Sequence, residues 1–454
     1  MHRAEQEAKG WLLHGQATFV WQYAPAFPSP YQGGSSLTPG DQARQTFSTD
    51  FILGRKPWEG AEVIVDPQIF RGFGLSQGVG AAAFPNGEAF KIGSDQPQIY
   101  FARLFLRQTF ALSQDTAPGD LDDPLHFNQP LPRERITLSA GKFSLFDFFD
   151  DNKYAHDPRT QFLNWSLVAA TGFDFAADAR GLANGFVAEY VNGAWGPRGG
   201  AFMVASRVNS LELDAEPPRH FQLAFEVDRF FKIGGRPGAV RLLYGFQQTA
   251  SQSYDALVAT GFANQDRNSA GSSVKHMLAA NFEQEIFDDI GLFGRLSWND
   301  GQSQSWMYTE QDRAVSLGLS FGGANWGRPK DTIGLATNVG WISDAHRRFL
   351  EAGGIGFITG DGRLNYAPEW LTELYYDVRL APGINAALDY QYLANPGYNA
   401  DRGLQAGGGG DQRLGWVGLL RGGGADAAGK ERGQGRTQRR NHSLRSCMVC
   451  LTGA

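Results

Sequence analysis

GINAALDYQYLAN, residues 383–395, alternates between two kinds of side chain. Successive side chains of a β-strand point to opposite faces of the sheet. The segment therefore predicts a strand with one apolar face, which ends in two tyrosines, and one polar face. The apolar set is Ile384, Ala386, Leu388, Tyr390 and Tyr392, and the other set is Asn385, Ala387, Asp389 and Gln391.

The same alternation returns in about sixteen segments between Gln16 and Asn395. Turn sequences separate them: NG at 192–193, GGRPG at 234–238, WNDGQ at 298–302, TGDGR at 359–363 and APG at 381–383. No block repeats with a fixed period, which disfavours propellers and solenoids, and no strand–helix alternation indicates a parallel sheet. In residues 98–110 the pattern places Tyr100, Ala102, Leu104 and Leu106 on one face and Phe101, Arg103, Phe105 and Arg107 on the other.

Composition narrows the class of protein. The 58 Gly, 33 Phe, 14 Tyr and 11 Trp among 454 residues favour β-structure with many tight turns. No apolar run reaches the ~18 residues of a membrane-spanning helix. A transmembrane barrel needs only segments of about ten alternating residues, so a mildly negative mean hydropathy is compatible with one. The net charge of −6 gives no reason to expect nucleic acid.

The composition of the polar face indicates whether that face lines a lumen or forms the surface of a soluble protein. It contains few Lys and mixes Arg, Glu, Asp, Gln, Asn, Thr and Gly, while aromatic residues gather near the segment ends, as in the girdles of lipid-facing barrels. We therefore predict an all-β fold, a transmembrane antiparallel β-barrel of about 16 strands with inward-folded loops. A soluble β-sandwich or jelly roll stays open on the pattern alone. The aromatic residues are Trp21, Tyr23, Trp195, Trp298, Trp341, Trp370, Tyr390 and Tyr392.

Two regions interrupt the strands, and both ends of the chain differ from its body. Residues 24–44 and 71–97 are long Pro- or Gly-rich connections, which in pores commonly fold inward. Residues 1–13 lack the apolar core of a signal peptide and are expected to be an N-terminal remnant; residues 14–403 are the predicted barrel. Residues 404–454 form a low-complexity tail that a frameshift would explain, and its Cys447-x-x-Cys450 is interpreted as a chance pair.

The densest group of charged residues lies in residues 139–167. Paired carboxylates for glycoside hydrolysis are one interpretation, although four acids in one loop define neither an acid nor a nucleophile. A calcium loop is another, although the EF-hand pattern is absent. The third is a structured loop in which Asp, Asn and Lys satisfy one another. The group comprises Asp147, Asp150, Asp151, Asn152, Asp157 and Arg159.

Several stretches, in order, resemble the carbohydrate-selective porins of bacterial outer membranes, the OprB family. They are FILGRKPWEGAEVIVDPQIFRGFGLS, IYFARLFLRQTF, GKFSLFDFFDDNKYAHDPRTQFLNWSL, LNYAPEWLTELYYDVRL and LDYQYLANPGYNADRG, and together they span roughly residues 11–403. The resemblance implies a barrel, commonly of 16 strands, that passes sugars by diffusion through a narrow, charged eyelet. Two features depart from it: the signal peptide is missing, and the tail replaces a last amphipathic strand ending in an aromatic residue.

For a sugar channel, selectivity is expected from hydrogen-bonding side chains and aromatic rings at a constriction. We predict Arg103, Arg107 and Arg135 at this constriction, with Glu373, Asp377 and Arg379 opposite. The alternative is a lumenal salt-bridge network that only solvates the wall.

The expected partners are mono- or oligosaccharides and outer-membrane lipid, without nucleic acid, and homo-oligomerisation stays open. No cofactor is expected beyond an unsupported structural calcium ion. No His-Glu-x-x-His or phosphate-loop motif predicts an enzyme. The alternatives are a general or acidic-sugar porin of the same fold, and a soluble carbohydrate-active β-protein with its acids around residues 147–157.

Overall fold

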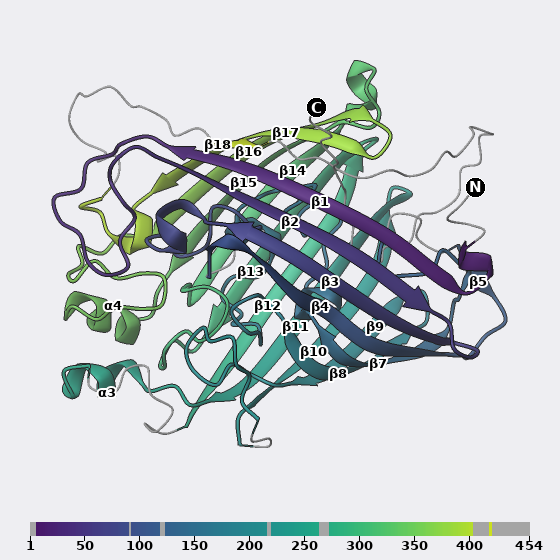
Figure 1. The fold of residues 1–454 in the computed structure, drawn as a ribbon, viewed down its shortest axis with the longest axis horizontal. Coiled ribbons are helices and arrows are strands. Elements are labelled where there is room, and N and C mark those ends of the chain that lie inside the picture. Colours follow the sequence, from purple (N-terminus) through teal and green to yellow (C-terminus); the bar gives the residue numbers. More distant parts are fainter. Residues whose placement is uncertain are drawn as a thin grey trace.

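One antiparallel sheet of sixteen strands dominates the computed structural model, which describes residues 6–89, 92–118, 123–215, 219–262, 272–402 and 417–419. Each strand pairs with its neighbours in chain order (Figure 1). The strands are β1 Trp11–Ala24, β2 Gln42–Arg55, β3 Ala61–Gly72, β4 Ser94–Ala111, β7 Arg135–Phe143, β8 Ala183–Val191, β9 Trp195–Phe202, β10 Phe221–Ile233, β11 Arg236–Thr249, β12 Ser273–Phe287, β13 Ile290–Asn299, β14 Arg313–Gly322, β15 Thr332–Trp341, β16 Glu369–Ala381, β17 Ile384–Ala394 and β18 Val417–Leu419.

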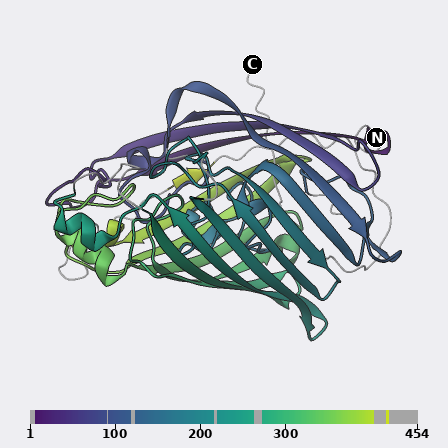
Figure 2. The same ribbon diagram turned by 90° about the horizontal axis from the view of Figure 1, so that it is seen from below.

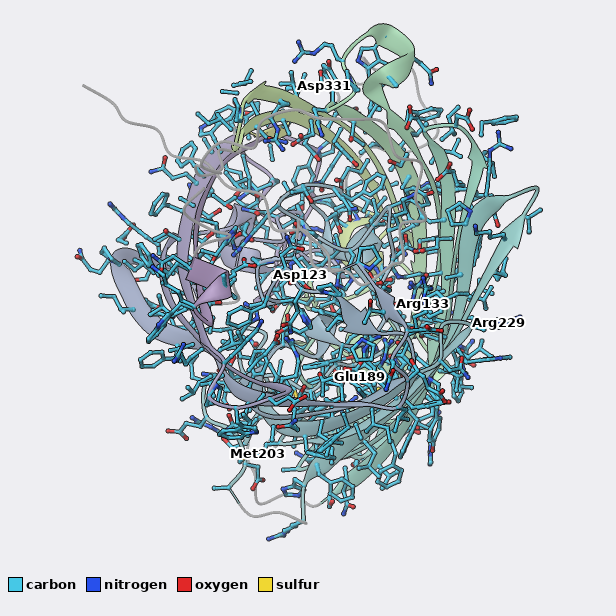
Figure 3. All side chains as sticks on the ribbon, turned by 90° about the vertical axis from the view of Figure 1, so that its right-hand side faces the viewer. Asp123, Arg133, Glu189, Met203, Arg229 and Asp331 are labelled. Carbon is cyan, nitrogen blue, oxygen red and sulfur yellow. The ribbon has the colours of Figure 1, made fainter. Side chains whose placement is uncertain are left out.

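Seen from one end, the strands surround an interior filled with side chains and loop segments (Figure 3). The last strand, β18, pairs with β17 and lies beside β1. The predicted all-β, antiparallel, sixteen-stranded architecture is confirmed. The number of segments is corrected, because the sheet takes fifteen strands from residues 11–394 and its sixteenth from the predicted tail. The other tail residues, Cys447 and Cys450 among them, lie outside the described residues.

The two faces of the wall follow the predicted alternation in most strands. In β17, Leu388 is exposed on the outside while Asn385, Ala387 and Asp389 are buried inside. Strand β1 begins at Trp11, within the stretch expected to be a remnant, and Trp11 and Leu13 already point outward. The wall is therefore apolar outside and polar inside, as a lipid-facing barrel requires.

A β-bulge in β4 overturns part of the pattern predicted for residues 98–110. The pairing with β3 shifts between Asp66 and Pro67, so that Arg103 faces Asp66 and Phe101 faces Pro67. Ala102 is the extra residue. As a result Phe101 is exposed outside and Ala102 is buried, the reverse of the prediction. Pro67 has no backbone N–H to donate, which makes this a natural point for the ladder to break.

The barrel has two unlike ends. At one end, tight turns join neighbouring strands, and the predicted NG, GGRPG and APG turns lie there; the glycines Gly193, Gly234 and Gly235 adopt the positive φ that such turns demand. The WNDGQ and TGDGR sequences lie at the other end, within long connections rather than tight turns. That end carries the helices α3 Tyr254–Ala259 and α4 Asp344–Glu351 (Figure 2).

Aromatic residues on the outer face lie near both rims. Trp21, Trp298 and Trp370 are near the long-loop end, and Trp195 and Trp326 are at the end with short turns. This distribution matches the interfacial girdles of membrane barrels. No helix in the described part of the chain is long and apolar enough to cross a membrane.

Two long connections turn inward and fill much of the lumen. Residues 75–89 follow β3 and contain the 3₁₀ turn η1 Leu75–Gly78. Residues 144–182 follow β7 and contain η2 Leu145–Asp147 and the helix α2 Trp165–Val168. Phenylalanines of the second segment pack on inward wall residues, so the apolar cluster inside the barrel holds a loop in place. Its ring-bearing members include Phe143, Phe148, Phe149, Phe173, Phe175, Phe202 and Trp306.

Smaller elements lie in the connections between the strands. β5 Thr116–Ala117 and β6 Leu131–Pro132 form a two-stranded sheet in the connection between β4 and β7. Two further 3₁₀ turns are η4 Gly323–Trp326 and η5 Pro396–Tyr398.

Candidate functional site in the lumen

The two inward segments meet and bind each other through their backbones. The Gly87 N–H donates to the Leu163 carbonyl at 2.7 Å, and the Trp165 N–H donates to the Phe84 carbonyl at 3.0 Å. Both segments also bond to the wall formed by β2, β3 and β4. The passage through the barrel is therefore narrowed where these segments face that wall.

Arg103 of β4 projects inward between the wall and the second segment. Its Nε and Nη2 donate to the two carboxylate oxygens of Asp147, both at 2.7 Å, and its Nη1 donates to Asp66 at 3.1 Å. Asp147 also forms the capping box of η2 with Ser144. The same carboxylate therefore holds both the η2 turn and the Arg103 side chain. The Arg103 side chain keeps 18% of its surface exposed. Since it points into the barrel, this exposed surface faces the lumen.

Arg159 of the second segment forms a matching group beside it. Its Nη1 donates to Asp50 of β2 and its Nε donates to Glu88 of the first segment, each at 2.7 Å. Burial opposes the charge, but the carboxylates of Asp50 and Glu88 raise the pKa of Arg159, so the guanidinium stays charged. Its side chain is 13% exposed.

A tyrosine and a third arginine extend this polar surface along the wall. Gln68 donates to Asp50 and accepts from the hydroxyl of Tyr100. The guanidinium of Arg180 lies over the Tyr100 ring, 4.2 Å from its centroid. We call Arg103, Arg159 and Arg180 with the carboxylates of Asp50, Asp66, Glu88 and Asp147 the arginine eyelet.

The predicted constriction residues do not lie together. Arg103 is part of the arginine eyelet, whereas Arg107 and Arg135 line a separate cavity at the end with short turns. Glu373 of β16 is fully buried and accepts the backbone N–H groups of Leu163 and Asn164. It holds the inward loop, and its carboxylate does not face an open lumen.

The other two predicted residues on β16 lie further towards the short turns. Asp377 is buried and accepts a hydrogen bond from Asn385 on β17. The backbone N–H of Arg379 donates to Asp331 in the β14–β15 connection. The role of all six residues in sugar binding stays a prediction.

The residues of the charged loop group bind the wall rather than one another. Asp150 accepts from Asn281 and Arg295, Asp151 pairs with Arg241 at 3.3 Å, and Asn152 donates to Asn281 at 2.7 Å. The expectation that these side chains satisfy each other within the loop is therefore corrected. Within the loop, Asp157 accepts from the Arg159 N–H and the Thr160 hydroxyl. Asp147, Asn152 and Asp150 accept the backbone N–H groups of Ser144, Tyr154 and Ala170, respectively. Within the described ranges, no group of three or more His, Cys, Asp or Glu side chains could hold a metal ion.

Four residues of the arginine eyelet, and the neighbouring Tyr100, were not singled out from the sequence. Asp50 and Asp66 occupy inward positions of β2 and β3, and the alternation around them could have identified them as lumenal. Tyr100 was assigned to the wrong face because of the bulge. Glu88 and Arg180 lie in loops, where no periodicity marks them.

Comparisons with known proteins agree with this architecture. A family model described as the carbohydrate-selective porin, OprB family, matches residues 35–409. The high-pH structure of OprB from Pseudomonas putida is similar with a TM-score of 0.67 at 16% sequence identity, covering 92% of this chain and 95% of that one.

Two further solved structures are more distant. The low-pH structure of the same P. putida protein has a TM-score of 0.44 at 14% identity, covering 87% of this chain and 91% of that one. The outer membrane channel DcaP of Acinetobacter baumannii has a TM-score of 0.46 at 11% identity, covering 85% and 91%. A comparison with curated protein sequences found no match.

The P. putida structure supports the barrel fold, and the family model spans far more than half of the residues. The chain thus belongs to the carbohydrate-selective porin (OprB) family, and it is an outer-membrane channel through which sugars pass.

Proposed function

We propose that the arginine eyelet selects the sugars that diffuse through this porin, and that it favours uncharged mono- or oligosaccharides. The observation that carries the proposal is the pair Arg103 and Arg159. Both guanidiniums are fixed by two carboxylates each and both keep lumenal surface. Side chains held in this way need no rearrangement to meet a passing hydroxyl group.

The N–H donors of Arg103 that are not used within the protein explain how a sugar would be recognised. A guanidinium has five N–H donors. Arg103 uses three of them on Asp147 and Asp66, which leaves two for a ligand. Adjacent hydroxyls of a sugar can accept from such a pair, and water takes their place when the sugar leaves. Binding of this kind is weak, as passage through a channel requires.

The charges of the arginine eyelet disfavour ions of either sign. Three guanidiniums stand among four carboxylates within one network of contacts. An anion or a cation would meet repulsion as well as attraction along this path, whereas a neutral polyol exchanges hydrogen bonds with both kinds of group. This balance supports uncharged sugars over acidic ones.

We also propose that the channel performs no reaction on the sugar and needs no cofactor. Glycoside hydrolysis requires a carboxylic acid that carries a proton, beside a second free carboxylate. Each of the four carboxylates of the arginine eyelet is paired with an arginine, so none of them is the free carboxylate that this reaction requires. Outer-membrane lipid is the proposed partner of the apolar outer face, and association of several copies stays a prediction.

The test is the block of single-channel current by glucose in planar bilayers. We expect the double variant Arg103→Gln/Arg159→Gln to bind glucose several-fold more weakly, because the donors that face the lumen are lost. The matched control is Arg236→Gln, which removes a turn arginine paired with the exposed Asp288. Unchanged glucose block in the double variant, with the control also unchanged, would refute the arginine eyelet.

A further inference from the structure

A cavity of about 290 Å³ lies at the end of the barrel with short turns, and Asp147, the partner of Arg103, lines it. Wall side chains of both charges line it, among them Arg107, Glu189 and Arg198. Asp147 and Phe148 of the inward loop also line it, so the cavity adjoins the arginine eyelet through Asp147. Figure 3 looks into this end, with Asp123 and Glu189 inside the ring of strands.

The connection between β4 and β7 forms the outer side of this cavity. It spans residues 112–134, whereas β8–β9, β10–β11 and β16–β17 are joined at the same end by only two or three residues. Leu125 and Phe127 of this connection are buried in the apolar cluster inside the barrel. The described residues of this connection, 112–118 and 123–134, are therefore folded into the mouth of the barrel.

Polar contacts fix this connection on the wall. Arg107 of β4 donates to the Leu125 carbonyl at 3.1 Å, and its Nη1 lies 3.0 Å from the His126 ring nitrogen. Gln129 donates to Glu62 at 3.1 Å, and Glu62 in turn pairs with Arg107 at 2.9 Å. The mouth is thus narrowed by a segment that the wall holds in place.

We propose that this cavity, here called the exit vestibule, is a second sugar-binding site in series with the arginine eyelet. The proposal rests on the proposed function, since it assumes that sugars arrive through the lumen. Short turns of bacterial barrels face the periplasm, so the exit vestibule is the last site before release.

The lining suits a neutral sugar of about monosaccharide size. The volume is close to the roughly 300 Å³ at which small-ligand pockets begin. Arg198 is held by Glu226 at 2.7 Å, Asp228 at 2.6 Å and Glu189 at 3.3 Å, so its charge is balanced. The Glu189 side chain is 17% exposed and can accept from sugar hydroxyls. Phe230 and Phe231 border the same space and offer surface to the C–H groups of a pyranose ring.

Protection of a cysteine from a thiol reagent measures occupancy of this site directly. In a background where Cys447 and Cys450 are serine, we use Glu189→Cys with a charged thiol reagent added on the side of the short turns. Glucose is expected to slow modification, by a factor of about two when its concentration equals its dissociation constant. The control is Asp288→Cys, at a side chain 95% exposed on the β12–β13 turn; glucose should leave its rate unchanged.

The same measurement in the Arg103→Gln/Arg159→Gln background separates the two proposals. If glucose still protects the thiol of Glu189→Cys in this background, and glucose block of the current is weakened, the result supports both the arginine eyelet and the exit vestibule. Absence of protection at Glu189→Cys and at a second position, His126→Cys, would overturn the exit vestibule and leave the arginine eyelet standing. A thiol that does not react at either position would overturn it too, because the cavity would then be closed to solutes. Protection together with unchanged block would refute the arginine eyelet alone.

Discussion

Asp174 shows how a single carboxylate organises the loops of the lumen. Its two oxygens accept the backbone N–H groups of Trp306, Met307 and Tyr308, and it pairs with the Lys275 ammonium at 3.0 Å. Burial would raise the pKa of Asp174, but Lys275 and these N–H groups outweigh it and hold the pKa below its usual value. The carboxylate therefore ties the β13–β14 connection to the loop that follows β7.

The lowered pKa makes a prediction about acid stability. A carboxyl whose folded pKa lies below its unfolded value of about 3.9 stabilises the fold above that pH, and the contribution is lost as the pH falls through the folded pKa. Asp174→Asn should lower the free energy of unfolding at pH 7 by about 3 kcal/mol, because Lys275 is left buried without its partner. Thermal unfolding in detergent between pH 7 and pH 3 measures this.

The contrast between pH values is the control for this experiment. The difference between the Asp174→Asn variant and the unmodified protein should begin to shrink as the pH falls below about 3.9, where the unfolded carboxyl takes up a proton that the folded one still lacks. It should go on shrinking until the pH is below the folded pKa of Asp174. A difference that stays constant from pH 7 to pH 3 would contradict the assigned role of Asp174.

At the scale of elements, inward carboxylates of the wall hold the loops by their backbones. Glu226 accepts the Asp150 N–H at 2.8 Å, and Glu283 accepts the Lys153 N–H at 2.6 Å. Further along, Glu373 accepts from Leu163 and Asn164, and Glu369 accepts from Ala82 and Gly397. The width of the passage thus depends on wall residues that no sugar needs to touch.

Glu373→Ala should release the inward loop that follows β7. Two buried N–H groups lose their acceptor, at a cost of about 1–3 kcal/mol each. We expect proteolytic cleavage within residues 144–182 and a larger, noisier single-channel conductance. The control is Glu351→Ala, which breaks an exposed pair with Arg347 on α4 and should cost no more than about 0.5 kcal/mol. A variant as resistant to protease as the control would show that the loop is held by other contacts.

The strands could be predicted from the sequence, and the contacts of the loops could not. Alternation has a period of two residues and is visible locally, so β17 and most of the wall were assigned to the correct faces. The bulge at Ala102 shifts the alternation by one residue, so the residues of β4 before Ala102 face the side opposite to the predicted one. The arginine eyelet joins residues far apart in the chain, such as Arg159 and Asp50, which are 109 positions apart. A single sequence contains no local signal for such a pair.

At the scale of the whole molecule, this barrel is the reverse of a soluble protein: its apolar side chains face outward and its charged side chains face inward. Exposed apolar side chains cover the outer face of nearly every strand, while charged groups are buried inside. In water such an apolar surface would drive aggregation; in a bilayer, hydrocarbon covers it. The function as a sugar channel depends on this arrangement, because only then is the polar side a water-filled path.

The most direct test of this arrangement is a spin-label scan of residues 384–392 in lipid bilayers. One cysteine at a time is introduced and labelled, with Cys447 and Cys450 replaced by serine, and collision with dissolved oxygen is measured. We predict high oxygen accessibility at positions 384, 386, 388, 390 and 392 and low values at the positions between them. Uniformly low values, as for a strand covered on both sides by protein, would contradict this prediction.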